Sequence, residues 1–530
     1  MNTDHCRRSN VGSIQFLDER DRSAIYGAAL EILAHVGMVV HHREALTLLA
    51  DAGCRIGSGA RVYVPEPIVE RARQSAPALV VLHDRFGEPA LELGEVNSYF
   101  GTGSDLMWTV DVETGDRKPS TLDDVARAAR LVDALPNMDF AMSSAYPGEV
   151  EAHHAYVLTF LAMMRNTGKP LVAIAENGSD LRVIRDLAAA LRGGREELRR
   201  KPYFAVYAEP CSPLAHPFDS IEKVLVCARA GIPCVYVPAP LTGATAPVTV
   251  AGYMAQGTAE SLLGMVVHQL CRPGAPFIFG HGHAVLDMAT AQSAYNAVEG
   301  YLIEMGMVEM AKWLDLPNFA NAGTTDSQVV DAQAGIDIAT ETLLVLQAGS
   351  NLNHNAGYLD FGLAGSLEGI VVTDEVIAQD RRLLTGIAVD RETLALDVVA
   401  SVGPGGHFLR ERHTRQHYHE DHWRPTVLNR LSHQTWVSQG CPDLRSRARR
   451  KALDILAAHE PLPLAPRVEW ACEELVAAFI SRDGARAPAA YVAQTGARAP
   501  AAFVVQAGGG VPAAVPSTVE AVVAEDVAPG

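Results

Sequence analysis

After Ser120 the chain alternates short apolar runs with longer stretches of helical periodicity. Alternation of strand-length and helix-length runs is typical of βαβ units, whose strands lie parallel in one sheet. Helical stretches such as Ala251–Leu270 and Ala291–Leu314 fill the gaps between the runs, and an eighth run lies at Gly369–Val372. The pattern predicts an α/β fold, a (β/α)₈ TIM-type barrel over residues 121–483 that ends in further helices. The first seven predicted strands are Phe140–Ala145, Leu171–Ala175, Phe204–Ala208, Cys234–Pro238, Phe277–Gly280, Asn318–Ala322 and Asn351–His354.

The patterns at the two ends of the chain differ from this alternation. Residues 18–52 carry apolar positions at helical spacing, and residues 62–119 show short strands, with a hairpin expected to turn at Glu113–Asp116. We therefore predict a helical and small-sheet extension over residues 1–120. Residues 484–530 are rich in Ala, Pro and Gly and contain a twelve-residue tandem duplication, which predicts a disordered tail.

Composition narrows the function classes. The chain has 530 residues, 48% of them hydrophobic, and a net charge of -18, which argues against nucleic acid as a partner. Eight scattered cysteines form no CxxC pair, no apolar run reaches the length of a membrane span, and the N-terminus lacks the apolar stretch of a signal peptide. We expect a cytoplasmic enzyme of reduced thiols, without a membrane partner.

Polar residues follow several predicted strands, where a parallel barrel builds its active site. Asp326 follows the sixth strand and His354 ends the seventh, so both are expected to be catalytic. The alternatives are that Asp326 caps a helix and that His354 is a buried core residue whose hydrogen bonds are made within the protein.

His281 and His283 stand at i and i+2 after a strand, so their rings are expected to point the same way. The spacing fits either a metal site of a barrel hydrolase, joined by His354 and Asp326, or the wall of a polar pocket. A second group, His413, His417, His419 and His422, lies among charged residues and indicates a surface helix rather than a zinc cluster.

An acid and several aromatic rings gather at other strand ends. Glu209 ends the third strand, and Tyr146, Tyr207, Tyr236 and Tyr358 stand at comparable positions. Ring faces together with a carboxylate form the usual site for a quaternary ammonium group. Packing in the core is the alternative role for any one ring.

Several ordered segments resemble the trimethylamine methyltransferase family over roughly residues 15–480. They are Asp111–Pro119, Pro238–Thr249, Ala259–Gly264, Gly274–Gly280, Thr325–Gly335 and Gly403–Leu409. The resemblance implies a barrel that moves a methyl group from an amine to the cobalt of a corrinoid carried by a separate protein, with no cofactor or metal held tightly by this chain. Archaeal members that act on trimethylamine carry pyrrolysine, whereas this chain has only standard residues. It therefore looks like the non-pyrrolysine branch, whose characterised members use quaternary amines such as glycine betaine.

From this resemblance we expect a small methylated amine as substrate, a corrinoid-binding protein as partner, and a homo-oligomer. Glu209, Tyr146, Tyr207, Tyr358, His281 and His283 are expected to bind the substrate, and His354 and Asp326 to orient it. Two rival readings remain open at this point: a metal-dependent hydrolase of the same barrel class, and a protein that binds a methylamine without turning it over.

Overall fold

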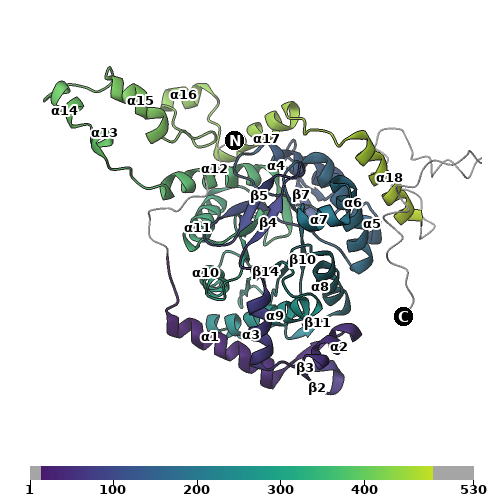
Figure 1. Cartoon of the computed structure of the whole chain (residues 1–530). Coiled ribbons are helices and arrows are strands. Elements are labelled where there is room, and N and C mark those ends of the chain that lie inside the picture. Colours follow the sequence, from purple (N-terminus) through teal and green to yellow (C-terminus); the bar gives the residue numbers. More distant parts are fainter. Residues whose placement is uncertain (1–13, 482–530) are drawn as a thin grey trace, which may run out of the picture.

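A curled sheet of parallel strands lies at the centre of the computed structural model, which describes residues 14–481 (Figure 1). Every neighbouring pair in this sheet is parallel. Six of the predicted strands are therefore confirmed as β9, β10, β12, β14, β17 and β18. In spatial order the sheet contains β6 (Tyr99–Thr102), β18 (Leu352–Ala356), β17 (Asn318–Asn321), β14 (Phe277–Gly280), β12 (Cys234–Tyr236), β10 (Phe204–Ala208) and β9 (Leu171–Ala173).

Helices between the strands form an outer layer around this sheet (Figure 1). The first of them begins with a capping box, in which Thr121 and Asp124 bond each other's backbone N–H groups. The predicted helix Ala291–Leu314 begins later, at Val298. The layer contains α4 (Leu122–Ala134), α5 (Ala152–Asn166), α6 (Gly178–Arg192), α7 (Arg195–Arg200), α8 (Phe218–Ala230), α9 (Val250–Cys271), α10 (Val298–Trp313), α11 (Ala332–Ala348) and α12 (Leu367–Leu384).

The predicted eighth strand, Gly369–Val372, is wrong. These residues lie in the first turns of α12, where the Ser366 hydroxyl accepts a hydrogen bond from the Gly369 N–H and so caps the helix. A four-residue apolar run fits a buried helix as well as a buried strand, and here all four residues are buried between helix and sheet.

The strand β6 occupies the edge of the sheet instead. Its sequence, Tyr99–Thr102, belongs to the stretch predicted as a small separate sheet, so that part of the prediction is wrong. Residues 140–141, predicted as a longer strand, make two isolated parallel bridges: Phe140 pairs with Gly101 of β6 and Ala141 with Leu171 of β9. These bridges connect the two edge strands of the sheet.

The concave face of the sheet has its own apolar core. Alternate strand residues such as Ala205, Val235, Ile278 and Phe319 meet there, and their neighbours face the helices. The hairpin β4 (Val80–His83) and β5 (Pro89–Leu93) packs against the same core. Its backbone bonds to residues that precede strands, as in the 2.8 Å bond from the His83 N–H to the Pro202 carbonyl. The hairpin therefore closes the amino end of the sheet, and the carboxyl end is left for a site.

Smaller elements surround this body. The predicted turn at 113–116 is confirmed as the hairpin β7–β8, and the predicted C-terminal helices are confirmed as α17 and α18. The predicted tail 484–530 lies outside the described residues. These elements are α1 (Glu19–Glu31), η2 (Ile32–Val36), β1 (Met38–Val40), α2 (Arg43–Asp51), β2 (Arg55–Ile56), η3 (Ser58–Ala60), β3 (Arg61–Tyr63), α3 (Glu66–Ser75), β7 (Trp108–Val110), β8 (Arg117–Pro119), β11 (Ala215–His216), β13 (Leu241–Thr242), β15 (Ala284–Leu286), β16 (Ser293–Ala294), β19 (Tyr358–Leu359), β20 (Ala364–Ser366), α17 (Leu444–Ala458) and α18 (Pro466–Ser481).

Four short helices, α13 (Arg391–Leu394), α14 (Leu396–Val402), α15 (Arg412–Asp421) and α16 (His433–Ser438), lie between α12 and α17. The histidine-rich run is confirmed as an exposed helix, α15. Within residues 14–481, no helix combines the length and the apolar character needed to cross a membrane.

Candidate functional site at the carboxyl ends of the strands

An acidic and aromatic group lies where β6 and β10 end. Tyr156 of α5 approaches Asp105, with 3.4 Å between its hydroxyl and Oδ2, and the Tyr207 hydroxyl donates to Glu209 at 2.9 Å. Burial raises the pKa of Asp105 to about 7, and the charge of Glu209 adds to the rise, while Tyr156 and Lys223 oppose it. Asp105 Oδ1 is buried and has no hydrogen-bond partner among residues 14–481. A carboxylate oxygen left without a donor, beside a second carboxylate, is an attractive place for a cation.

The Tyr358 ring borders the same loop. Its hydroxyl accepts a hydrogen bond from the Ser104 N–H at 2.7 Å and donates to the Ser104 carbonyl, which ties the segment after β18 to the segment after β6. Gly103 makes this approach possible, because a Cβ atom there would lie 2.2 Å from the Tyr358 ring and 2.3 Å from the Asn355 amide oxygen. The predicted site residue Tyr358 therefore lies beside Asp105, with its hydroxyl already bonded.

Replacing Gly103 with alanine is expected to lower the free energy of unfolding by about 1–3 kcal/mol, because the new methyl group overlaps a buried ring that cannot move freely. Urea unfolding followed by circular dichroism measures the change. Gly335→Ala is the matched control: it lies in α11 with nothing near its Cβ position, and alanine there is expected to stabilise by up to about 1 kcal/mol. Equal stability of the two variants would contradict the close approach at Gly103.

Asp326 fixes the backbone before α10. Its two carboxylate oxygens accept hydrogen bonds from the N–H groups of Tyr295 and Asn296, each at 3.0 Å. Burial raises the pKa of Asp326, and these two bonds oppose the rise. The pKa of Tyr295 is raised, first by burial of its hydroxyl and then by the negative charge of Glu209. The geometry gives Asp326 a positioning contact with Tyr295, and its predicted catalytic role stays a prediction.

His354 lies on the concave face of the sheet. Its ring stacks on Phe319 with 4.0 Å between centroids, and Phe319 also meets the edge of the Tyr207 ring. The ring nitrogen Nδ1 lies 2.8 Å from the Ala320 carbonyl, so Nδ1 carries the proton and Nε2 the lone pair. Burial lowers the pKa of His354 to about 4, and the imidazole is therefore neutral near pH 7.

His281 and His283 both contact Glu304 of α10, as their i, i+2 spacing predicts for rings that point the same way. His281 Nε2 lies 3.3 Å from Glu304 Oε1, and His283 Nδ1 forms an ion pair with Oε2. All three side chains are almost fully buried between strand and helix. Burial alone would raise the pKa of Glu304 and lower that of His283, but their mutual attraction reverses both shifts. The two histidines form an internal ionic cluster, and their predicted substrate contact stays untested.

Buried glutamates on neighbouring helices hold other strand-end segments. Glu260 of α9 accepts hydrogen bonds from the Ser212 hydroxyl and the Leu214 N–H after β10. Glu341 of α11 accepts the Thr324 N–H at 2.9 Å after β17. Burial raises the pKa of Glu341 to about 7, so this carboxyl titrates near neutrality. Successive helices thus use one acid each to fix the loops around the carboxyl end of the sheet.

The reading of a metal-dependent hydrolase finds no support in this geometry. His283 already uses both ring nitrogens, Nδ1 towards Glu304 and Nε2 at 3.0 Å from the Tyr295 carbonyl. Among residues 14–481, side chains of ligand type approach within 4.8 Å of one another as a group of three at Glu151, His153 and His154. That group contains none of the residues predicted for the hydrolase.

The remaining predicted rings separate into two environments. Tyr146 is half-buried near the site, and its ring meets that of Tyr156 edge to face with 5.9 Å between the ring centroids. Tyr236, grouped with it in the sequence analysis, is fully buried on the helix side of β12, where its hydroxyl lies 2.7 Å from His216 Nδ1. The expectation that Tyr236 contributes to the aromatic site is wrong, since its neighbours Val235 and Val237 take the concave face.

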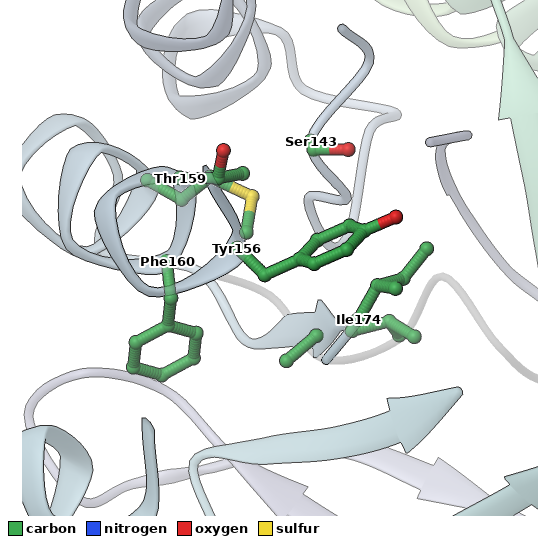
Figure 2. Close-up of a pocket in the computed structure, with 8 residues that line it drawn as sticks. Ser143, Tyr156, Thr159, Phe160 and Ile174 are labelled. Carbon is green, nitrogen blue, oxygen red and sulfur yellow. The ribbon is translucent and has the colours of Figure 1, made fainter. Parts of the chain in front are cut away.

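A small cavity lies behind the acidic group. Tyr156 separates Ser143 from Ile174 at its lining, and Thr159 and Phe160 of α5 also line it (Figure 2). Its volume of about 10 Å³ is the room of one water molecule. This cavity is too small for a methylated amine, so it does not serve as the substrate site.

Sequence reasoning missed Asp105, Tyr156, Tyr295 and Glu304. Asp105 follows the apolar residues of β6, and assignment of that strand to the centre of the fold would have indicated it. Glu304 is one of three glutamates in α10, and an acid with apolar neighbours on both sides in the middle of a helix signals a buried partner. No pattern in the sequence singles out Tyr156 or Tyr295.

Comparison with known proteins extends the resemblance found in the sequence. A profile of the trimethylamine methyltransferase family matches residues 2–488. The trimethylamine methyltransferase MttB of Desulfitobacterium hafniense is 30% identical over 471 residues, 89% of this chain and 95% of the relative. A glycine betaine methyltransferase from the same species is 28% identical over 465 residues, 87% of this chain and 96% of the relative. The solved monomethylamine methyltransferase of Methanosarcina barkeri shares 12% identity, with a TM-score of 0.47 over 85% of this chain and 96% of its own.

Proposed function

Since the chain belongs to the trimethylamine methyltransferase family and is a methyltransferase, we propose that its donor is a quaternary methylammonium compound such as glycine betaine. The observation that carries the proposal is the unpartnered Oδ1 of Asp105 beside Glu209. Two carboxylates lie close together here, and one of their oxygens accepts no hydrogen bond. Such a site favours a ligand that carries positive charge and needs no hydrogen-bond partner of its own. A tetra-alkylated nitrogen has this chemistry.

Aromatic rings complement these carboxylates. Burial and then the charge of Glu209 raise the pKa of Tyr207, and Tyr295 and Tyr358 act on the same hydroxyl. Their electrostatic coupling supports a shared environment, in which ring faces bind the methyl groups of a cation through cation–π attraction of about 0.5–2 kcal/mol each. Tyr207, Tyr295 and Tyr358 are therefore proposed as the walls of the cation site, with Tyr146 at its margin.

Removal of a methyl group from a quaternary ammonium needs no acid to protonate the leaving group. When the C–N bond breaks, its electron pair stays on nitrogen, and a tertiary amine leaves without needing a proton. We propose that a corrinoid carried by a separate protein supplies the nucleophilic cobalt that accepts the methyl group. The residues of this chain then bind the cation, orient its N–CH₃ bond and exclude water. His354, neutral and with its Nε2 lone pair unprotonated, is proposed to orient the donor rather than transfer a proton.

We also propose that the central sheet closes as an eight-stranded (β/α)₈ barrel, with residues 140–141 as its second strand. Support comes from the two isolated parallel bridges that connect those residues to Gly101 of β6 and Leu171 of β9. Closure would place the ends of all eight strands around one opening, where such barrels carry their sites. The predicted division at residue 120 remains a proposal, although β6 lies before it.

Purified protein is expected to methylate a corrinoid carrier with glycine betaine as donor, and dimethylglycine should appear in equal amount. Visible absorbance follows the change of the corrinoid, and mass spectrometry follows the amine. Trimethylamine serves as the comparison donor, because it tests whether the fourth substituent on nitrogen is required. Absence of transfer from betaine, choline, carnitine and proline betaine would overturn the proposed donor class.

A further inference from the structure

Three side chains of metal-ligand type converge at the start of α5. Glu151 is the residue before the helix, and His153 and His154 lie in its first turn. Oε2 of Glu151 lies 3.3 Å from His153 Nε2 and 3.9 Å from His154 Nδ1. One nitrogen or oxygen atom from each side chain lies within 4.8 Å of the other two. Two imidazoles and a carboxylate are a ligand set that Zn²⁺ and similar divalent ions take from proteins.

The distances between these atoms are close to those of a tetrahedral metal site. Ligands that bind zinc at about 2.0–2.2 Å lie about 3.3–3.6 Å from one another in a tetrahedron. The two carboxylate–imidazole distances, 3.3 and 3.9 Å, lie in or just beyond this range. Because Glu151 and His153 are exposed, small rotations of their side chains are enough to bring the three atoms onto one ion. Three protein ligands leave the fourth position of the tetrahedron for water.

The two histidine rings meet, although neighbouring residues of a helix usually point in different directions. Their centroids are 4.0 Å apart, with 57° between the ring planes. His154 is fully buried, and its ring lies edge to face against Phe479 of α18, which packs beside α5 (Figure 1). One ligand is thus held in place by the core, and the other two reach it from the solvent side. A ligand that is already positioned lowers the entropic cost of binding.

The surroundings of the three side chains are acidic. The pKa of Asp180, at the start of α6, is raised to about 6 by burial and then by the charge of Glu176, and His153 is among the groups that oppose the rise. Both carboxyl groups are therefore near enough to attract a cation bound at His153. The positive end of the α5 dipole opposes a cation, but only weakly compared with direct coordination by three ligands.

We propose that Glu151, His153 and His154 bind one divalent transition-metal ion of the class of Zn²⁺, with water in the remaining position. The ion ties the start of α5 to the residue that precedes the helix. Tyr156, two residues after His154, approaches Asp105 from the same helix, so the ion also holds one wall of the candidate site in place. Its role is structural, because none of its three ligands is a residue proposed to contact the methyl donor.

The test is zinc binding to the full-length protein, prepared without a histidine tag and freed of metal by dialysis against EDTA. Titration calorimetry with Zn²⁺ alone is expected to show binding to the wild type. Loss of a partner that only supports a metal ligand lowers affinity about 10–100-fold, so loss of a ligand in His153→Ala or Glu151→Gln is expected to lower it about a hundredfold or more. The exposed histidines of α15 also attract zinc, so the decisive quantity is the loss of one bound equivalent from each variant.

Controls separate loss of the site from loss of the fold. Both substituted side chains are exposed, so the circular dichroism of the two variants should match that of the wild type. His433→Ala, at an exposed position of α16, removes a histidine elsewhere and is expected to leave zinc binding unchanged. Co²⁺ in place of Zn²⁺ should give the visible absorbance of a tetrahedral site in the wild type, and this absorbance should be absent in His153→Ala.

Thermal unfolding gives a second readout. An ion that binds only the folded chain stabilises it, so saturating Zn²⁺ is expected to raise the Tm of the wild type by about 2–5 °C more than that of His153→Ala. Two results would overturn the proposal: a metal-free wild type that takes up no zinc, or variants that bind zinc with the stoichiometry and affinity of the wild type. Neither measurement uses a methyl donor, so the outcome does not depend on the proposed reaction.

Discussion

Replacement of Glu304 with alanine is expected to lower the free energy of unfolding by about 3–5 kcal/mol. The carboxylate is fully buried and contacts His281 and His283, and its Oε1 accepts the Asn321 N–H at 2.6 Å. Its removal leaves two imidazoles and a backbone N–H in a cavity without an acceptor, and such uncompensated burial is costlier than the loss of an exposed pair. Urea unfolding followed by fluorescence measures the change.

The pH dependence of the same unfolding experiment tests the ionic character of this cluster. The pKa of His283 is raised, so its contribution to stability is present below the ordinary histidine pKa of about 6.5 and is lost as pH rises through the folded-state pKa. The pKa of Glu304 is lowered, so its contribution is present above about 4.3 and is lost as pH falls. Stability from the cluster is therefore expected to be greatest between these values.

Matched variants separate charge from volume. Glu304→Gln keeps an acceptor for the Asn321 N–H but removes the charge, so it should flatten the pH dependence with a smaller loss of stability than alanine. Glu299→Ala, in the exposed first turn of α10, is expected to change stability by less than about 1 kcal/mol. An alanine variant at Glu304 as stable as the one at Glu299 would show that the ionic cluster does not support the fold.

Most strands of the central parallel sheet could be predicted, because burial on both faces makes them nearly continuous apolar runs. The same reasoning failed at Gly369–Val372, since a short run in the first turns of a buried helix looks identical. It also placed β6 in the wrong sheet. That strand lies before Ser120, where the regular alternation begins, and only long-range pairing with β18 reveals its place.

Prediction of the site shows a similar limit. Position at a strand end identified Glu209 and Tyr207, which the structure brings together at 2.9 Å. The direction of a side chain beyond the strand could not be predicted in the same way. His281 faces Glu304 and Tyr236 faces His216, both towards the helix layer. Which side a loop residue takes depends on partners far away in sequence, and no local pattern encodes them.

Replacement of Asp105 with asparagine is expected to raise the KM for glycine betaine at pH 8 by about tenfold to a hundredfold, with a smaller effect on kcat. A unit charge about 5 Å from a cation contributes about 3 kcal/mol at an effective dielectric constant of 20, and asparagine lacks that charge. The steady-state rate of dimethylglycine formation, measured against betaine concentration with saturating corrinoid carrier, gives both constants. Glu113→Gln, at an exposed position of the β7–β8 turn, is the control and should leave KM unchanged.

The pH dependence of KM tests the role of Asp105 more directly. The pKa of Asp105 is raised to about 7, first by burial and then by Glu209, so the carboxyl is neutral below pH 7 and charged above it. A cation binds the charged form, and the KM of the wild type is therefore expected to fall as pH rises from 6 to 8. Asparagine does not titrate, so the variant should show a nearly constant, high KM over this range. A variant that retains the wild-type slope would place the titrating group elsewhere, because the loss of Asp105 would then leave the pH-dependent binding of the cation intact.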